Sequence, residues 1–240
     1  GFRKVSLNFI WKQGVAAILS NSLANEWDLL NGGGNIKRVF INGVYQGAYF
    51  QEFLVDKTFL EYHKRPGVDE FAFNERWDTT YRNTHRNPLT ESETNFKISN
   101  FSGKNIGQIS LFKKLLNSVD APDNMIPLVD VDKFAKIDAL RMIFGSFKAI
   151  RGDNLKFLFY TTRGVFEPYF RTEGHVNKIN SKSKIRAINI TMYTDAQNDG
   201  DAKIFRTLVK SEKFRKSRDK YINQLVLAKE KILNDYDTLV

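Results

Sequence analysis

Apolar residues recur at the three- to four-residue spacing of an amphipathic helix in several stretches of the chain. The first stretch covers residues 15–27, and a flexible glycine-rich turn at 31–35 ends it. A short helix is predicted over residues 107–117. Asp130 precedes a stronger helical pattern as its N-cap, and residues 203–237 predict two further helices.

Short apolar stretches between these helices predict β-strands. Residues 36–52 give the clearest pattern, which is two strands joined by Asn42-Gly43. This dipeptide favours a two-residue hairpin turn, because both of its positions need a positive φ. Residues 156–160 and 165–169 predict a second pair of strands.

Helices and hairpins are mixed without a regular strand–helix–strand alternation, which indicates an α+β fold. A length of 240 residues is typical of one large domain. A chain of this length buries about 70% or more of its unfolded surface, so it can form a core without disulfides or a structural metal ion. The 20 Phe residues favour an aromatic-rich core. Residues 79–105 are rich in Asn, Thr and Ser, and little regular structure is expected there.

The composition excludes several kinds of chemistry. The chain has no Cys, which excludes disulfides, thiolate nucleophiles and Cys-ligated metal sites. No apolar run is long enough to span a membrane. The first residue is Gly and no apolar leader follows it, so we expect the chain to be N-terminally incomplete.

The net charge of +10 favours anionic partners, such as nucleotides, nucleic acid, anionic lipid or an acidic protein. Basic residues gather between positions 203 and 220, and such a run is usually the solvated face of a helix. The alternative is a surface that binds polyanions. Nucleic acid is the least favoured partner, because no groove-reading motif accompanies the charges. The basic residues are Lys203, Arg206, Lys210, Lys213, Arg215, Lys216, Arg218 and Lys220.

Two segments carry candidate chemistry. Gly47 lies inside a predicted strand, where glycine marks a bulge or a close approach of backbone or ligand, and Glu52 follows as a candidate buried acceptor. Asp153 and Asn154 come between a glycine-bearing loop and an apolar strand. Phosphoryl transfer needs oxygen ligands of this kind for magnesium and an acid that orients the attacking hydroxyl. The simpler interpretation is an Asx-turn that starts the strand.

Three segments, in order along the chain, resemble the spore-coat CotH kinase family. Residues 39–52 contain Asn-Gly-Val-Tyr-Gln-Gly-Ala-Tyr and a trailing Glu. Residues 129–134 read Val-Asp-Val-Asp-Lys-Phe. Residues 153–157 read Asp-Asn-Leu-Lys-Phe, and Phe-Glu-Pro follows at 166–168. The resemblance covers roughly residues 5–235.

The resemblance implies a protein-kinase-like domain with two lobes. A small lobe with the β-hairpin would take residues 1–60, a larger and mainly helical lobe would take residues 61–240, and ATP with Mg²⁺ (or Mn²⁺) would bind between them. The implied activity is transfer of the ATP γ-phosphoryl group to Ser or Thr of a protein. The residues carried over from the family are Glu52 and Gly47 for the nucleotide, Asp153 for catalysis, and Asn154 with Glu173 for the metal ion.

Two departures from the family pattern weaken the implied activity. Arg171 stands about where the family has the Asp that holds magnesium, and an arginine does not ligate a cation. No early lysine has a spacing that identifies it as the partner of the phosphates. The alternative is therefore a catalytically impaired, pseudokinase-like scaffold or a coat assembly protein. In either case the resemblance implies a protein partner at a spore coat, a cell surface or outside the cell.

Overall fold

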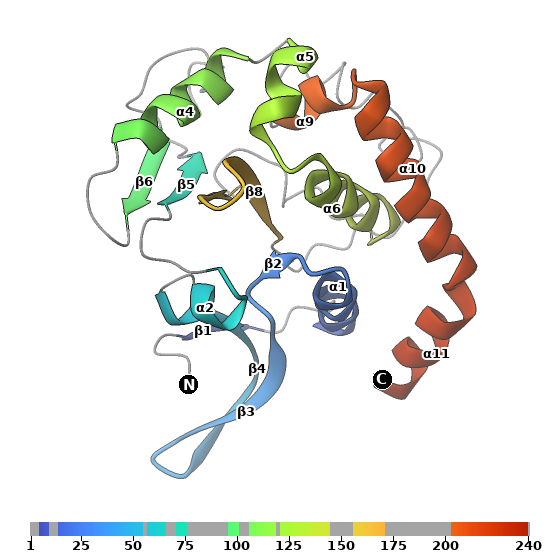
Figure 1. Ribbon diagram of the computed structural model, residues 1–240. Coiled ribbons are helices and arrows are strands. Elements are labelled where there is room, and N and C mark those ends of the chain that lie inside the picture. The colour runs from blue at the N-terminus through green and yellow to red at the C-terminus, as the bar shows by residue number, and fades with distance from the viewer. Residues whose placement is uncertain are drawn as a thin grey trace, which may run out of the picture.

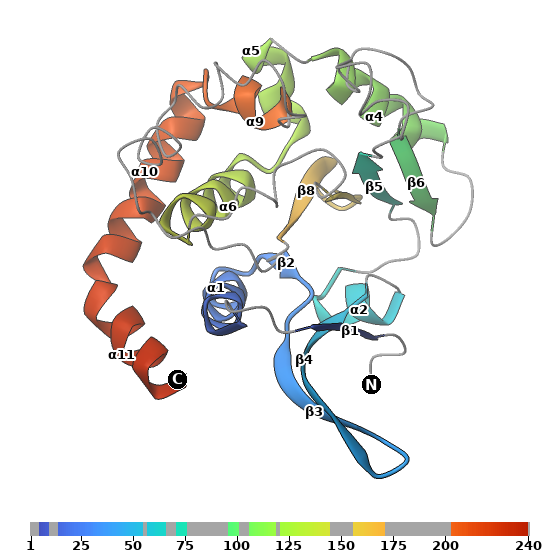
Figure 2. The same cartoon turned by 180° about the vertical axis from the view of Figure 1, so that it is seen from behind.

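The computed structural model describes residues 5–9, 14–54, 57–65, 71–75, 96–100, 106–118, 121–144, 156–170 and 203–239. These residues form two β-sheets with helices around them (Figure 1). Strands and helices alternate irregularly along the chain, so the predicted α+β class is confirmed. Seen from behind, the long helices at the C-terminal end (red) follow one side of the molecule and end near the first helix (Figure 2).

The smaller sheet has three antiparallel strands in the order β1-β4-β3. They are β1 (Val5–Phe9), β3 (Asn35–Ile41) and β4 (Val44–Phe53). Asn42 and Gly43 join β3 to β4 with φ angles of 51° and 81°, which confirms the predicted turn with two positive φ angles. The hairpin projects from the rest of the molecule (Figure 1), and most residues near its tip are exposed.

Gly47 marks a bulge in this hairpin. The register between the strands shifts where Val39 pairs with Gly47 and Phe40 pairs with Tyr45. Gly47 has a φ of 118°, a conformation that side chains with a Cβ rarely adopt. The bulge expected at this glycine is therefore present.

The larger sheet has five strands in the order β2-β8-β7-β5-β6. Only the β2–β8 pair is parallel, and the other neighbours are antiparallel. The predicted strands at 156–160 and 165–169 are confirmed as β7 and β8. The bounds are β2 (Leu30–Asn31), β5 (Phe71–Glu75), β6 (Phe96–Asn100), β7 (Lys156–Tyr160) and β8 (Val165–Phe170).

The predicted helices at 15–27, 107–117 and after Asp130 are confirmed within one or two residues. The Asp130 carboxylate accepts a hydrogen bond from the Lys133 backbone N–H at 3.2 Å, as an N-cap does. The helices are α1 (Gly14–Glu26), α2 (Lys57–Tyr62), α4 (Ile106–Asn117), α5 (Pro122–Met125), the 3₁₀ turn η3 (Ile126–Leu128), α6 (Val131–Phe144), α9 (Lys203–Leu208), α10 (Glu212–Leu227) and α11 (Lys229–Leu239).

The alternation of side chains along β8 divides the core into two parts. Phe166 and Phe170 belong to the main core, together with residues of α4, α6, α9 and α10. Tyr169 points the other way and joins Phe59 and Leu60 of α2 in a smaller core. The main core is rich in aromatic residues, as the Phe content predicted. Its buried Phe residues include Phe112, Phe134, Phe159, Phe166, Phe170, Phe205 and Phe214.

Two lysines of α6 hold the end of α1. Lys136 Nζ donates to the Trp27 carbonyl at 3.2 Å, and Lys133 Nζ donates to the Asp28 carbonyl. Carbonyl groups at a helix C-terminus have no partner within the helix and carry partial negative charge. The two lysines satisfy these carbonyls and fix α1 against α6.

Two sequence predictions were wrong in part. Residues 79–105 were expected to have little regular structure, but β6 lies within that range and pairs with β5. Residues 203–237 were expected to form two helices, but α9, α10 and α11 cover them. Helix α9 ends at Leu208, and the Arg215 side chain donates to the carbonyls of Val209 and Lys210 that follow it, each at 2.8 Å.

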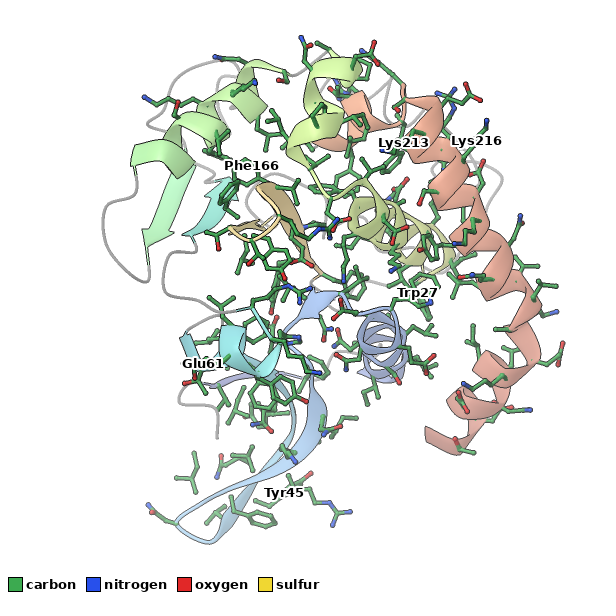
Figure 3. The ribbon with its side chains drawn as sticks, viewed as in Figure 1. Trp27, Tyr45, Glu61, Phe166, Lys213 and Lys216 are labelled. Atoms are coloured by element: carbon green, nitrogen blue, oxygen red, sulfur yellow. The ribbon has the colours of Figure 1, made fainter. Side chains whose placement is uncertain are left out.

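The main core generates a test of the fold. We expect Phe166→Ala to lower the free energy of unfolding by about 3–5 kcal/mol, because Phe166 is fully buried and its removal leaves a cavity. Tyr45→Ala is the control, since Tyr45 is 54% exposed on the hairpin (Figure 3), and it should change stability by less than about 0.5 kcal/mol. Urea unfolding measures both values. Equal effects of the two substitutions would contradict the assignment of the core.

Candidate functional site

Glu52 lies where the two sheets meet. It is 9% exposed at the end of β4. The Gly32 carbonyl accepts a hydrogen bond from the Phe53 N–H at 2.8 Å, which holds the glycine-rich segment against β4. A Cβ at Gly32 would overlap the Glu52 side chain and lie 2.6 Å from the Tyr169 hydroxyl. Gly32 therefore allows Glu52 of the small sheet and Tyr169 of the large sheet to approach each other.

A buried ion pair lies beside this contact. The Arg65 guanidinium donates to both oxygens of Glu167, from Nε at 2.8 Å and from Nη2 at 2.7 Å. Glu167 is 1% exposed. Two parallel hydrogen bonds of this kind match the planar guanidinium to the carboxylate. Arg65 also lies over the Tyr160 ring, with 5.0 Å between its central carbon and the ring centroid.

Lys133 and Asp28 extend the pair into a cluster of four charges. Lys133 Nζ lies 3.6 Å from Glu167 and also contacts the Asp28 carboxylate. Arg65 Nη2 reaches the same carboxylate at 3.4 Å. Asp28 is the exposed member, and it follows α1 with a φ of 54°. We call Asp28, Arg65, Lys133 and Glu167 the junction cluster.

The junction cluster shifts the pKa values of Asp28 and Arg65 and of the neighbouring His63. Burial acts to raise the pKa of Asp28, but the hydrogen bond and charge of Lys133, together with Arg65, hold it below the usual value. The hydrogen bond to Glu167 raises the pKa of Arg65. Burial lowers the pKa of His63, and the charge of Arg65 lowers it further. His63 is therefore neutral at pH 7.

The cluster satisfies its own charges. Arg65 donates to Glu167, to Asp28 and to the His63 carbonyl, and Lys133 donates to Asp28 twice. A buried cation that already has carboxylate partners must lose them before it binds a ligand anion, and that loss costs several kcal/mol. The geometry therefore favours a role in joining segments of the fold.

The predicted site residues fall into two groups. Glu52 and Gly47 lie on the same strand but five residues apart, which corresponds to about 17 Å along β4. The structure therefore does not bring Gly47 to the sheet junction where Glu52 lies. Asp153, Asn154 and Glu173 lie outside the described residues, as does Arg171.

No role was predicted for Arg65, Lys133 or Asp28 from sequence. Arg65 and Glu167 are 102 residues apart in the chain, so no local pattern connects them. Glu167 offered one signal, because a charged residue inside an otherwise apolar strand needs a partner when it is buried. Lys133 offered no comparable signal, since the first turns of α6 also contain Asp132 and Lys136.

The basic stretch at 203–220 divides in the structure. Lys213 and Lys216 of α10 (labelled in Figure 3) are exposed, as are Lys210 and Lys220. Arg218 is instead buried and lies 3.6 Å from Asp138 of α6. The stretch is therefore partly a solvated face and partly a structural contact between α6 and α10.

Metal-ligating groups and membrane-spanning helices are both absent from the described residues. That part of the chain contains no group of three or more metal-ligating side chains. It also contains no helix with the length and apolar character needed to cross a bilayer. The donors proposed for a metal ion, Asn154 and Glu173, lie outside it.

The chain was compared with known proteins. No protein-family model matches it, and no curated protein matches it.

The buried ion pair can be tested by substitution. We expect Arg65→Met to lower the free energy of unfolding by about 3–5 kcal/mol, because Glu167 loses its bidentate partner while it stays buried. Arg65→Met combined with Glu167→Gln should recover part of this loss. The control is Lys216→Met, which removes an exposed pair with Glu212 and should cost less than about 1 kcal/mol. Urea unfolding measures the stability of the parent protein and of the three variants. If the double variant is the least stable of the four, the assignment of the buried ion pair is contradicted.

The pKa of His63 generates a pH test. Because its pKa is lower in the folded protein than in the unfolded chain, the unfolded chain binds more protons as the pH falls through about 6.5. The contribution of His63 to stability is therefore present above that pH and is lost below it. The His63→Gln variant should not show this loss of stability at low pH.

The measurement is thermal unfolding of both proteins between about pH 7 and pH 5. The parent protein should lose stability relative to His63→Gln as the pH falls. The comparison between the two proteins cancels the titration of the other histidines. If the unfolding temperatures of the two proteins fall equally with pH, a lowered pKa at His63 is contradicted.

Proposed function

We propose that this chain is a CotH-like, protein-kinase-like domain that transfers the γ-phosphoryl group of ATP to Ser or Thr of a protein. The observation that supports the proposal is that the start of β7 and the end of β8 lie next to each other. Lys156, the first residue of β7, pairs with Tyr169, and Tyr169 pairs with Leu30 of β2. Both strand ends therefore lie at one edge of the large sheet, beside Gly32 and Glu52.

The covalent chain ties the predicted site residues to this edge. Asp153 precedes Lys156 by three residues, and Glu173 follows Phe170 by three residues. Three residues span at most about 11 Å. The acid, the amide of Asn154 and the second acid are thus within reach of the edge where Glu52 is buried.

The proposed roles follow from the chemistry of these groups. Asp153 would orient the acceptor hydroxyl and accept its proton, and Glu52 would line the nucleotide site. Asn154 and Glu173 offer oxygen ligands, which suit Mg²⁺ or Mn²⁺. A bound ion would neutralise negative charge on the phosphate oxygens. Arg171 does not fit as a ligand of that ion, but it is a suitable partner for phosphate.

The two lobes belong to the same proposal. The three-stranded sheet with α1 and α2 would be the small lobe, and the five-stranded sheet with the remaining helices would be the larger lobe. Residues 1–60 also contribute β2 to the larger sheet, so the lobes would be joined by a strand pair as well as by the chain. The protein acceptor would be a coat or surface protein, as the family resemblance implies.

A second candidate function is a scaffold that keeps the fold without turnover. The observation that favours it is that Arg65 and Lys133, two buried cations close to the sheet junction, are both held by carboxylates. A phosphoryl-transfer site needs a cation for the phosphates, and Arg171 replaces an expected metal ligand. A scaffold needs neither group.

ATP binding distinguishes a working nucleotide site from a site that has been lost. We expect ATP with Mg²⁺ or Mn²⁺ to raise the unfolding temperature, because a ligand at a hundredfold excess over its Kd stabilises the folded state by about 2.7 kcal/mol. Asn154→Ala combined with Glu173→Ala should abolish the metal-dependent part of the shift, because these two residues offer the oxygen ligands for the ion. Asp237→Ala is the control, since Asp237 is exposed on α11.

Transfer of labelled phosphate then separates the two candidates. Turnover in the parent protein that Asp153→Ala removes would support the kinase. Binding without turnover, with turnover restored by Arg171→Asp, would support the scaffold. No ATP-dependent shift with either metal ion would contradict the kinase proposal.

A further inference from the structure

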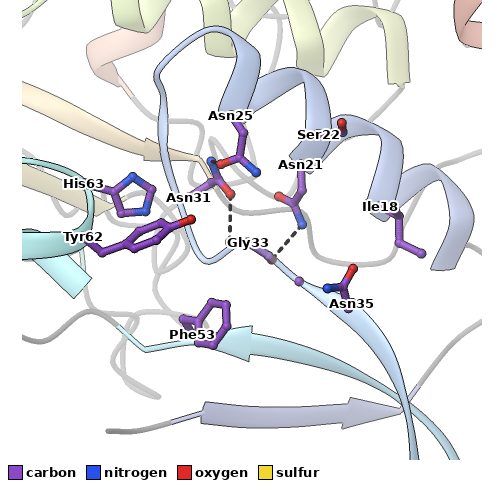
Figure 4. A pocket seen from close by; sticks show the side chains of 11 residues that line it. Ile18, Asn21, Ser22, Asn25, Asn31, Gly33, Asn35, Phe53, Tyr62 and His63 are labelled. Carbon is purple, nitrogen blue, oxygen red and sulfur yellow. Dashed lines mark hydrogen bonds between the residues drawn. The ribbon is translucent and has the colours of Figure 1, made fainter. Parts of the chain in front are cut away.

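A pocket of about 300 Å³ lies between α1, the glycine-rich segment and the end of α2 (Figure 4). Glu52, the described member of the proposed transfer site, is not among the described residues that line it. Its volume is at the lower end of the range for small-molecule sites, about 300–1,000 Å³, which suits a single ring. The described residues that line it are Ile18, Asn21, Ser22, Asn25, Asn31, Gly33, Gly34, Asn35, Phe53, Tyr62 and His63.

The amide groups of one wall are fixed by hydrogen bonds that use only part of their capacity. Asn21 donates its Nδ2 to the Gly33 carbonyl at 3.1 Å, and the Asn21 Oδ1 has no partner among the described residues. Asn25 accepts the Asn31 amide at its Oδ1, at 2.9 Å, and the Asn25 NH₂ has no described partner. Gly33 N–H donates to Asn31 Oδ1 at 2.8 Å. One acceptor and two donor hydrogens therefore stay available in oriented side chains.

The other wall is aromatic. The rings of Tyr62 and His63 meet edge to face, with centroids 5.2 Å apart and planes at 86°. The Phe59 ring lies against the His63 ring, with 4.4 Å between their centroids, and Phe53 also lines this wall. Tyr62 is 68% exposed, so its ring stands at the mouth of the pocket, where it can meet a ligand. The wall offers apolar ring faces and the neutral imidazole of His63.

The described lining carries no charge. Among the residues that the structure describes, no Asp, Glu, Lys or Arg lines the pocket, so these residues offer no counter-charge to a phosphate or a metal ion. The nearby Arg65 is held by Glu167 and Asp28. A ligand that suits this pocket is therefore neutral and rich in groups that both donate and accept hydrogen bonds.

We propose that the pocket binds a neutral sugar ring, either a free monosaccharide or a sugar residue of a glycan. Each hydroxyl of a sugar donates and accepts, which matches the amides of Asn21 and Asn25. The C–H face of the ring packs on aromatic side chains such as Tyr62. A purine base would need apolar surfaces on both faces, whereas this pocket has rings on one side and amides on the other.

The test is saturation-transfer NMR on the full chain with glucose, galactose and N-acetylglucosamine, each up to about 20 mM, a concentration that detects millimolar dissociation constants. At least one sugar should bind. Asn25→Asp keeps the Oδ1 that accepts from Asn31 but replaces the donor NH₂ with an oxygen. It should weaken binding about tenfold, the size expected for one lost hydrogen bond. Tyr62→Ala should also weaken the binding of that sugar.

Asn223→Asp is the matched control, because it adds the same charge at an exposed position on α10 and should leave sugar binding unchanged. Circular dichroism should show that all three variants are folded. Two results would overturn the proposal: no binding of any of the three sugars by the parent, or binding that Asn25→Asp and Tyr62→Ala leave unchanged.

Adenosine in the same NMR experiment tests the purine alternative. Binding of adenosine, but of no sugar, that Asn25→Asp weakens would also overturn the proposal and assign the pocket to the nucleotide. The ATP-dependent thermal shift of Asn25→Asp should equal that of the parent protein. Loss of sugar binding is thereby distinguished from failure of the kinase proposal.

Discussion

The guanidinium of Arg65 connects separate parts of the fold through one side chain. It binds Glu167 of β8 with two hydrogen bonds, lies over Tyr160 of β7 and reaches Asp28 after α1. Arg65 itself follows α2, whose Phe59 and Leu60 pack on Tyr169. Because charges in such a buried position are costly without partners, each of these segments must be in place for the others to be stable. The position of Glu52 beside Tyr169 depends on this arrangement.

The same interaction limits what the junction offers to a ligand. Lys133 completes the neutralisation of Glu167 and Asp28, and it also binds the carbonyl that follows α1. Two positive and two negative charges therefore balance within the cluster. Phosphate recognition by a nucleotide site at the sheet edge would need another cation, and Arg171 follows the last residue of β8 directly in the sequence. Under the proposed function, the residue that departs from the family pattern would serve as a partner for phosphate.

Local chemistry made part of this structure predictable. Asn42 and Gly43 specify their turn because both adopt a positive φ, and Asp130 specifies the start of α6 through a hydrogen bond within one turn. The strand at 96–100 was missed, because its stability comes from a partner strand more than twenty residues earlier. The junction cluster was missed for the same reason, since its members meet only after the chain has folded. Glu52 was predicted as a buried acceptor and is buried, but the roles of Asp153, Asn154 and Glu173 remain predictions.

The glycine-rich segment at 31–35 was expected to be a flexible turn, yet hydrogen bonds and close packing hold it. Gly33 is bonded to Asn31 and Asn21, and a Cβ at Gly34, which has a φ of 146°, would lie 2.8 Å from the Gln51 carbonyl. One side of the segment meets Glu52 at the sheet edge, and the other side lines the neutral pocket. A ligand at either place would contact the same few residues. Any effect of one on the affinity of the other would therefore be reciprocal, and it would pass through the backbone that joins Gly32 to Gly33.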